Sequence, residues 1–100
     1  MGLKVINTRT HHVKIYPGNF AMMKAGQKPF DVRLDDRQYE RGDTIVFKEW
    51  DPDVERFTGE TITREIGCKQ IWEGLSPGFA AFGLVDVSPD YTPPQAGDHK

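Results

Sequence analysis

The sequence predicts a small β-rich α+β domain: a partly open β-barrel of five or six strands with one short helix after the first main strand. Apolar and polar residues alternate in several short segments, as in strands with one buried face. One segment near the N-terminus instead has helical spacing between residues suited to the two ends of a helix. Only the first connection is long enough to carry a helix, and parallel strands need such crossovers.

The length of 100 residues suits one domain with its own core. Hydrophobic residues make up 37% of the chain, so a core is feasible without a metal or a disulfide. The single cysteine, Cys68, can form neither an intramolecular bridge nor a multi-cysteine zinc site. We expect one domain over residues 1–87 and a flexible, polar, proline-rich tail over residues 88–100.

The first clear strand is the segment THHVKIY, which ends before a Pro-Gly pair. Alternation places Val13 and Ile15 toward the core and His12 and Lys14 on the opposite face. Residues 1–8 are a candidate additional strand because they contain three aliphatic residues.

The short helix is predicted over NFAMMKAG. Asn19 is a good acceptor for the free amides at a helix start, and Gly26 suits the left-handed position after a helix end. Phe20 and Met23 are three residues apart and therefore lie on one face, which packs on the core.

The next strand is PFDVRL. Phe30, Val32 and Leu34 share one of its faces, and Asp31 and Arg33 share the other. We expect Phe30 to belong to the core.

Three further strands follow, and turn-forming residues separate them. They are TIVFKEW, TITREIGCKQIW and AAFGLVDVS. Ile45 and Phe47 are expected in the core, and Gly67 is expected to mark a bulge. The Asp-Pro and Thr-Gly dipeptides of DPDVERFTGE predict a hairpin connection.

The charges are unevenly distributed along the chain. Residues 1–30 contain five Lys and Arg residues and no Asp or Glu, although the whole chain has a net charge of −2. This asymmetry suggests an anionic partner for the basic part. The alternative is that the basic residues pair with acidic ones and serve solubility.

Several kinds of chemistry lack support in the sequence. His11 and His12 are adjacent on a strand and point to opposite faces, so they cannot bind one metal ion together. Glycine-rich phosphate-binding loops are absent, and the two serines lack a nucleophile context. We therefore expect no metal and no cofactor. With no signal-peptide pattern and no long apolar run, we expect a cytoplasmic protein without membrane contact.

A set of basic and aromatic residues is the best candidate for a binding site. Cationic side chains neutralise phosphates and aromatic rings stack on bases, so interleaving them suits single-stranded nucleic acid. The set is His12, Lys14, Lys28, Arg33, Arg37 and Tyr39. Five residues are assigned structural support, namely Asp31, Asp36, Gly26, Gly42 and Asp43. In particular, Asp31 should orient Arg33, because the two share one strand face. Salt bridges within the set are the alternative explanation for its charges.

The stretch HHVKIYPGNFAMMKAGQKPFDVRLDDRQYERGDTIVFKEWD resembles the ASCH domains of the PUA-like superfamily, and most closely a small branch found in bacteria and their phages. The resemblance covers about residues 11–87 and depends on the order and spacing of its elements. The matching residues are His11, Lys14, Pro17, Gly26, Lys28, Phe30, Asp31, Arg33, Asp36, Arg37, Gly42 and Asp43.

The resemblance implies a PUA-like barrel that binds RNA in a cleft between the short helix and the second strand. Lys28 and Arg33 would reach toward the ligand. Two alternatives remain: an amidohydrolase-like enzyme that acts on modified nucleosides with Lys28, and a phage accessory protein that docks on a host protein. Asp31 departs from the wider family, which usually has Glu at this position, and this weakens the enzymatic alternative.

Overall fold

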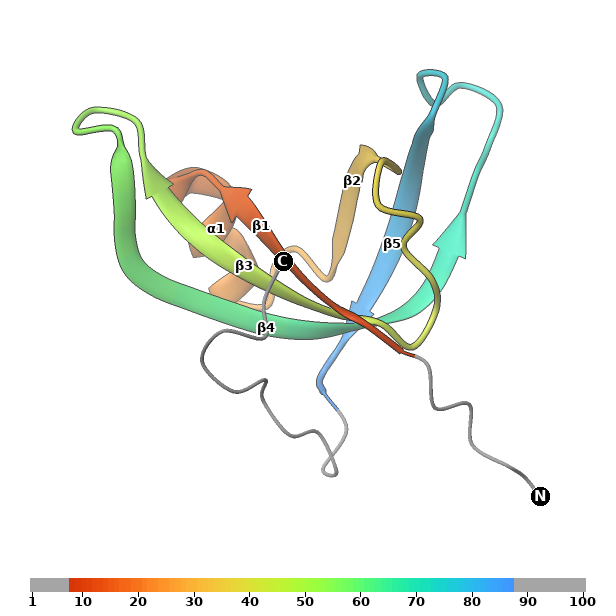
Figure 1. The fold of residues 1–100 in the computed structure, drawn as a ribbon, viewed down its shortest axis with the longest axis horizontal. Helices are drawn as coiled ribbons and strands as arrows, with labels where there is room; N and C mark the ends of the chain where they lie inside the picture. The colour runs from red at the N-terminus through yellow and green to blue at the C-terminus, as the bar shows by residue number, and fades with distance from the viewer. Residues whose placement is uncertain (1–7, 88–100) are drawn as a thin grey trace.

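The computed structural model describes residues 8–87. The helix and strands follow in the order β1 (Thr10–Ile15), α1 (Pro17–Lys24), β2 (Phe30–Leu34), β3 (Thr44–Asp51), β4 (Arg56–Gln70) and β5 (Phe79–Val85). They form a small β-rich α+β domain with one five-stranded sheet and one helix (Figure 1). The expected tail over residues 88–100, and all but the last residue of the expected strand over residues 1–8, lie outside the described part.

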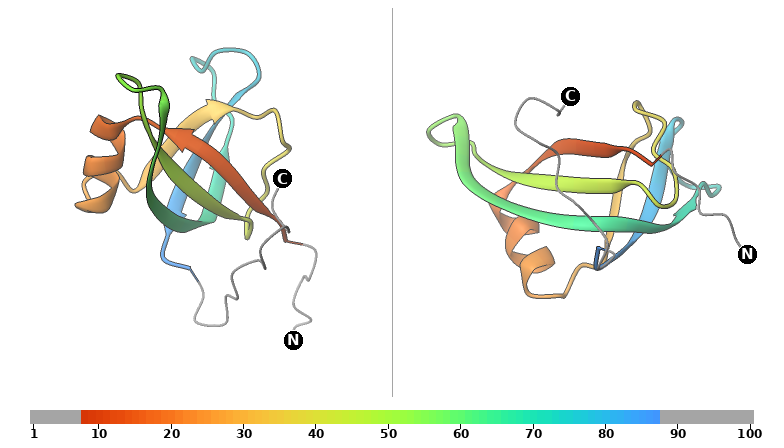
Figure 2. Two further views of the ribbon diagram at one scale, coloured as in Figure 1. Left: turned by 60° about the vertical axis from the view of Figure 1, so that its left-hand side comes forward. Right: turned by 60° about the horizontal axis from the view of Figure 1, so that its bottom comes forward.

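The sheet is mixed, and its strand order is β1-β3-β4-β5-β2. β1 and β3 are parallel, because α1 and β2 lie between them in the chain, and the other neighbouring pairs are antiparallel. The long strand β4 is bent, and as the middle strand of the sheet it pairs with β3 in one half and β5 in the other (Figures 1 and 2). Within residues 8–87, β1 and β2 are the two edges, so the sheet is open and does not close into a barrel.

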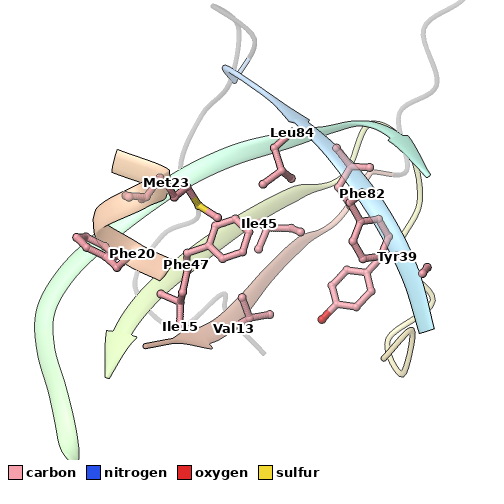
Figure 3. Close-up of a cluster of buried hydrophobic side chains, with 12 residues drawn as sticks. Val13, Ile15, Phe20, Met23, Tyr39, Ile45, Phe47, Phe82 and Leu84 are labelled. Atoms are coloured by element: carbon pink, nitrogen blue, oxygen red, sulfur yellow. The ribbon is translucent and has the colours of Figure 1, made fainter. Parts of the chain in front are cut away.

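The core lies on the inner side of the curved sheet (Figure 3). Ile45 and Phe47 of β3 are fully buried, as predicted, and Phe20 and Met23 anchor α1 to the core. The other members are Val13, Ile15, Tyr39, Ile62, Ile66, Ala80, Phe82 and Leu84.

The two ends of α1 differ in how well the sequence predicted them. The helix begins at Pro17 with Tyr16 as its N-cap, so the assignment of Asn19 as the N-cap is wrong. Proline suits the first helical position because its fixed φ is helical and it needs no amide partner there. Gly26 has a φ of 79°, and its predicted left-handed conformation after the helix is confirmed.

The face of β2 that turns toward the core is the charged one. Asp31 is buried, whereas Phe30, Val32 and Leu34 are 47–48% exposed. The prediction that Phe30 belongs to the core is therefore wrong. The alternation itself is confirmed, and Figure 3 shows large side chains of β3, β5 and the loop after β2 on the inner side of the sheet.

β4 is longer than predicted. The β3–β4 turn lies within residues 52–55, and the Thr58-Gly59 pair expected at a turn lies inside the strand. The expected bulge near Gly67 is confirmed by the shift in register between Ile66 and Cys68 opposite β5. In the part of the chain that the structure covers, no helix is long and apolar enough to cross a membrane.

Candidate functional site

Three charged side chains gather at the start and on the core-facing side of β2, and we call them the β2 charged cluster: Lys28, Asp31 and Arg33. The buried Asp31 carboxylate accepts a hydrogen bond from Arg33 Nε, and its Oδ1 lies 3.6 Å from Lys28 Nζ. The Arg33 side chain is 23% exposed and the Lys28 side chain 15%. Two cations thus compensate one buried carboxylate, which also fixes their positions. The predicted pairing of Asp31 with Arg33 is present.

Arg33 lies among aromatic rings as well as beside a carboxylate. Its guanidinium carbon is 5.8 Å from the centroid of the Phe47 ring, within the range of a cation–π interaction. It also interacts with the phenol of Tyr39. Burial raises the pKa of that phenol above its ordinary value, although the charges of Arg33 and Arg37 act in the opposite direction. Arg33 therefore interacts with a carboxylate, an aromatic ring and a phenol.

A second basic group lies at the start of β1, at the opposite end of this strand from α1 (Figure 1). Here four of the residues that the structure describes line a hollow, which we call the arginine hollow: Arg9, Thr10, His11 and Arg37. Arg37 comes from the loop after β2, and its Nη1 donates a hydrogen bond to the His12 carbonyl at 2.7 Å. Arg9 donates to the Gln38 carbonyl of the same loop. Both guanidinium groups are thus hydrogen-bonded to backbone carbonyls.

The buried Asp43 carboxylate organises this end of the sheet. Its Oδ2 lies 2.8 Å from His11 Nε2 and accepts a hydrogen bond from the Glu40 amide at 3.1 Å. Its Oδ1 accepts a hydrogen bond from the Arg9 amide at 3.0 Å, and the Arg9 guanidinium lies 3.7 Å from Oδ2. These contacts agree with the support role assigned to Asp43, and they join β1 to the loop before β3.

The predicted binding residues fall into three groups. Lys28 and Arg33 lie together in the β2 charged cluster, and Arg37 lines the arginine hollow. Tyr39 is 1% exposed, so its ring offers no face to a base, and we withdraw it as a stacking residue. His12 and Lys14 project from the face of β1 opposite Val13.

Lys14 contacts the outer face of the sheet. Its Nζ lies 4.6 Å from the ring centroid of Trp50 and 5.8 Å from that of Tyr16. Because successive residues of a strand point to opposite faces, Lys14 cannot reach the β2 charged cluster across the sheet. The expectation that Lys14 and Arg33 line one cleft is therefore not met.

Sequence reasoning missed Arg9 and His11 as members of a basic hollow. Arg9 meets the loop residue Gln38 only through the fold, and no local pattern indicates that contact. The strand alternation did place His11 on the face opposite Lys14, and its burial follows from that. Among residues 8–87, no group of three or more His, Cys, Asp or Glu side chains could hold a metal ion.

A match to a known protein family covers most of the described domain. A family model described as a domain of unknown function, DUF3850, matches residues 10–84, which include the helix, four whole strands and β5 up to its next-to-last residue. The chain belongs to the DUF3850 family. The matched range contains the β2 charged cluster and three of the four residues of the arginine hollow, so these features lie within the DUF3850 domain itself.

A phage protein is similar to this DUF3850 chain. It is an "uncharacterized 12.9 kDa protein in GpA 3'region" of Escherichia phage P2, and it is 38% identical over 58 residues. The match covers 58% of this chain and 51% of the phage protein, so it spans about half the length of that relative.

Proposed function

We propose that this DUF3850 domain is an ASCH-like, PUA-like module that binds single-stranded RNA along β2 and the loop that follows it. The observation that carries the proposal is the β2 charged cluster. Burying the charged face of a strand lowers the stability of the fold unless the charges are paired. Here a buried carboxylate pairs with two cations that remain partly accessible. A bound phosphate would add a further partner for these cations.

The arrangement of charges supports an anionic ligand. The carboxylates of Asp31 and Asp43 are buried, whereas the nearby cations retain exposed surface. Asp35 is paired with Lys69, with 2.8 Å between Oδ2 and Nζ. The accessible surface of this region therefore carries more positive charge than the count of charged residues in its sequence suggests. The exposed Asp36 reduces this positive potential.

Single-stranded RNA suits this surface better than a duplex. The cations lie along β2 and the loop that follows it. A flexible single-stranded RNA can adapt the positions of its phosphates to such a path. The guanidinium of Arg33 also presents several donors in a plane, which favours contact with phosphate oxygens or a base edge.

The proposal is tested by measuring the affinity of a short fluorescent RNA over a range of NaCl concentrations. Each neutralised phosphate releases counterions, so affinity should fall steeply with salt. For Arg33→Ala we expect at least a tenfold weaker Kd, and a slope of log affinity against log salt that is smaller by roughly 0.7. Arg56→Ala, in which the replaced arginine is exposed at the far end of β4, is the matched control and should bind as the wild type does.

The folding of the variants must be followed separately, because Asp31 is buried and loses a partner in Arg33→Ala. Arg33→Lys keeps the positive charge beside Asp31 and provides a second variant, with an intermediate affinity expected. An affinity that is insensitive to salt, or an equal loss in Arg33→Ala and Arg56→Ala, would contradict the proposal.

A second candidate function is docking on another protein through β2. Within residues 8–87, β2 pairs only with β5, and it exposes an apolar row of Phe30, Val32 and Leu34. An edge strand of this kind can accept an extended segment of a partner by strand addition. Failure of the wild-type domain to bind any RNA at low salt would favour this candidate.

A further inference from the structure

The arginine hollow is separate from the β2 charged cluster and has its own chemistry. It is lined by Arg9 just before β1, by Thr10 and His11 of β1, and by Arg37 of the loop after β2. We propose that the hollow binds a phosphate monoester group, the terminal phosphate of a nucleotide or of an RNA chain.

The two arginines are held in place before any ligand arrives. Arg37 donates one hydrogen bond to the His12 carbonyl, and Arg9 donates one to the Gln38 carbonyl. A guanidinium has five N–H donors, so each arginine keeps donors for a ligand. Preorganised donors lose less conformational entropy on binding, and paired arginines match the geometry of phosphate oxygens.

The charges around the hollow favour an anion. Asp43 is the carboxylate nearest to Arg9 and His11, and it is almost entirely buried behind them. Arg37 donates to a neutral carbonyl, and the ion pairs of residues 8–87 do not include one between Arg37 and Asp36. Among residues 8–87, one paired carboxylate thus stands against two permanent cations, which leaves a net positive charge for an anionic ligand.

The hollow and the β2 charged cluster are near neighbours along the chain. The charges of Arg33 and Arg37 both act on the pKa of the Tyr39 phenol, so both sites lie near this residue. If RNA binds along β2, as proposed above, its phosphorylated end would lie in the arginine hollow. This last step depends on the proposed function, whereas binding of free phosphate does not.

The test is an NMR titration of the full chain with inorganic phosphate, with chloride at equal ionic strength as the reference. We expect saturable shifts of the amides of residues 9–12 and 37–38. Arg37→Ala should weaken the phosphate affinity at least tenfold, whereas Arg41→Ala, a change at an exposed arginine of the same loop, should leave it unchanged. Arg37→Gln removes the charge but keeps a donor for the His12 carbonyl, so it provides a readout if the alanine variant unfolds.

The ligand source is distinguished with RNAs of one sequence that carry a 5'-phosphate, a 3'-phosphate or two hydroxyl ends, beside free nucleoside monophosphates. A preference for a phosphorylated end that disappears in Arg37→Ala assigns the hollow to RNA ends. Saturable binding of the monophosphate without any RNA binding supports the hollow and overturns the RNA proposal. Shifts that never saturate, or that Arg37→Ala and Arg37→Gln leave unchanged, overturn the phosphate site.

Discussion

At the scale of single residues, Asp35 shows how a loop carboxylate joins distant parts of the chain. Its Oδ1 accepts a hydrogen bond from the Tyr39 amide at 3.0 Å, and its Oδ2 lies 2.8 Å from Lys69 Nζ on β4. Burial alone would raise the pKa of Asp35, but these two hydrogen bonds and the positive charge of Lys69 bring the pKa below its ordinary value.

The lowered pKa of Asp35 predicts a dependence of stability on pH. A carboxyl group whose pKa is lower in the folded state stabilises the fold above its unfolded pKa, and this contribution is lost as the pH falls through the folded pKa. Wild type should therefore be more stable than Asp35→Asn at neutral pH, and the difference should shrink from about pH 5 downward. Urea unfolding at several pH values measures it, with Asp53→Asn in the exposed β3–β4 turn as the control. A difference that is the same at every pH would refute the assignment.

Individual contacts were predictable from the sequence only where they are local. Asp31 and Arg33 are two residues apart on one strand, and strand geometry alone indicates their ion pair. Tyr39 lies in a polar loop, and its burial depends on ring contacts with His11 and Phe82, which are distant in sequence. No periodicity carries that information.

At the scale of elements, β2 shows the limit of alternation as a guide. The pattern determines which residues share a face, but not which face turns inward. Apolar residues normally face the core, and in β2 they are half-exposed while Asp31 is buried. The charges of the β2 charged cluster compensate one another, so this orientation does not bury an unpaired charge.

A matched pair of substitutions tests the orientation of β2. Val13 and Val32 are on the two edge strands, but Val13 is 4% exposed and Val32 is 47% exposed. Threonine has nearly the shape of valine, so the variants differ mainly in whether a hydroxyl is buried. We expect Val13→Thr to lower the free energy of unfolding by about 1–3 kcal/mol, and Val32→Thr to change it by about 0.5 kcal/mol or less. Urea denaturation compares them, and a larger loss at Val32 would mean that β2 faces the other way.

At the scale of the whole molecule, the loop between β2 and β3 compensates for the open sheet. The Tyr39 ring is 4.5 Å from the His11 ring on β1 and 5.1 Å from the Phe82 ring on β5, measured between centroids. These two strands are not neighbours in the sheet, so Tyr39 joins its two halves (Figure 3). Lys69 Nζ of β4 donates to the Tyr39 carbonyl at 2.8 Å and adds a further link.

This role predicts that Tyr39 controls the stability of both halves of the domain together. Removing a fully buried aromatic ring leaves a large cavity, so Tyr39→Ala should lower the free energy of unfolding by about 3–5 kcal/mol. Tyr39→Phe keeps the ring contacts with His11 and Phe82 and should cost only about 1 kcal/mol through the lost phenol interaction. The two variants therefore separate the contribution of packing from that of the hydroxyl.

The two tryptophans allow each half to be followed by fluorescence during urea unfolding. Trp50 lies near the end of β3, and Trp72 follows β4 on the side of β5. In the single-tryptophan backgrounds Trp72→Phe and Trp50→Phe, Tyr39→Ala should shift both unfolding midpoints by the same amount, because a small cooperative domain unfolds as one unit. A midpoint that moves only for Trp72 would show that Tyr39 stabilises one half alone, and that the two halves do not unfold as one unit.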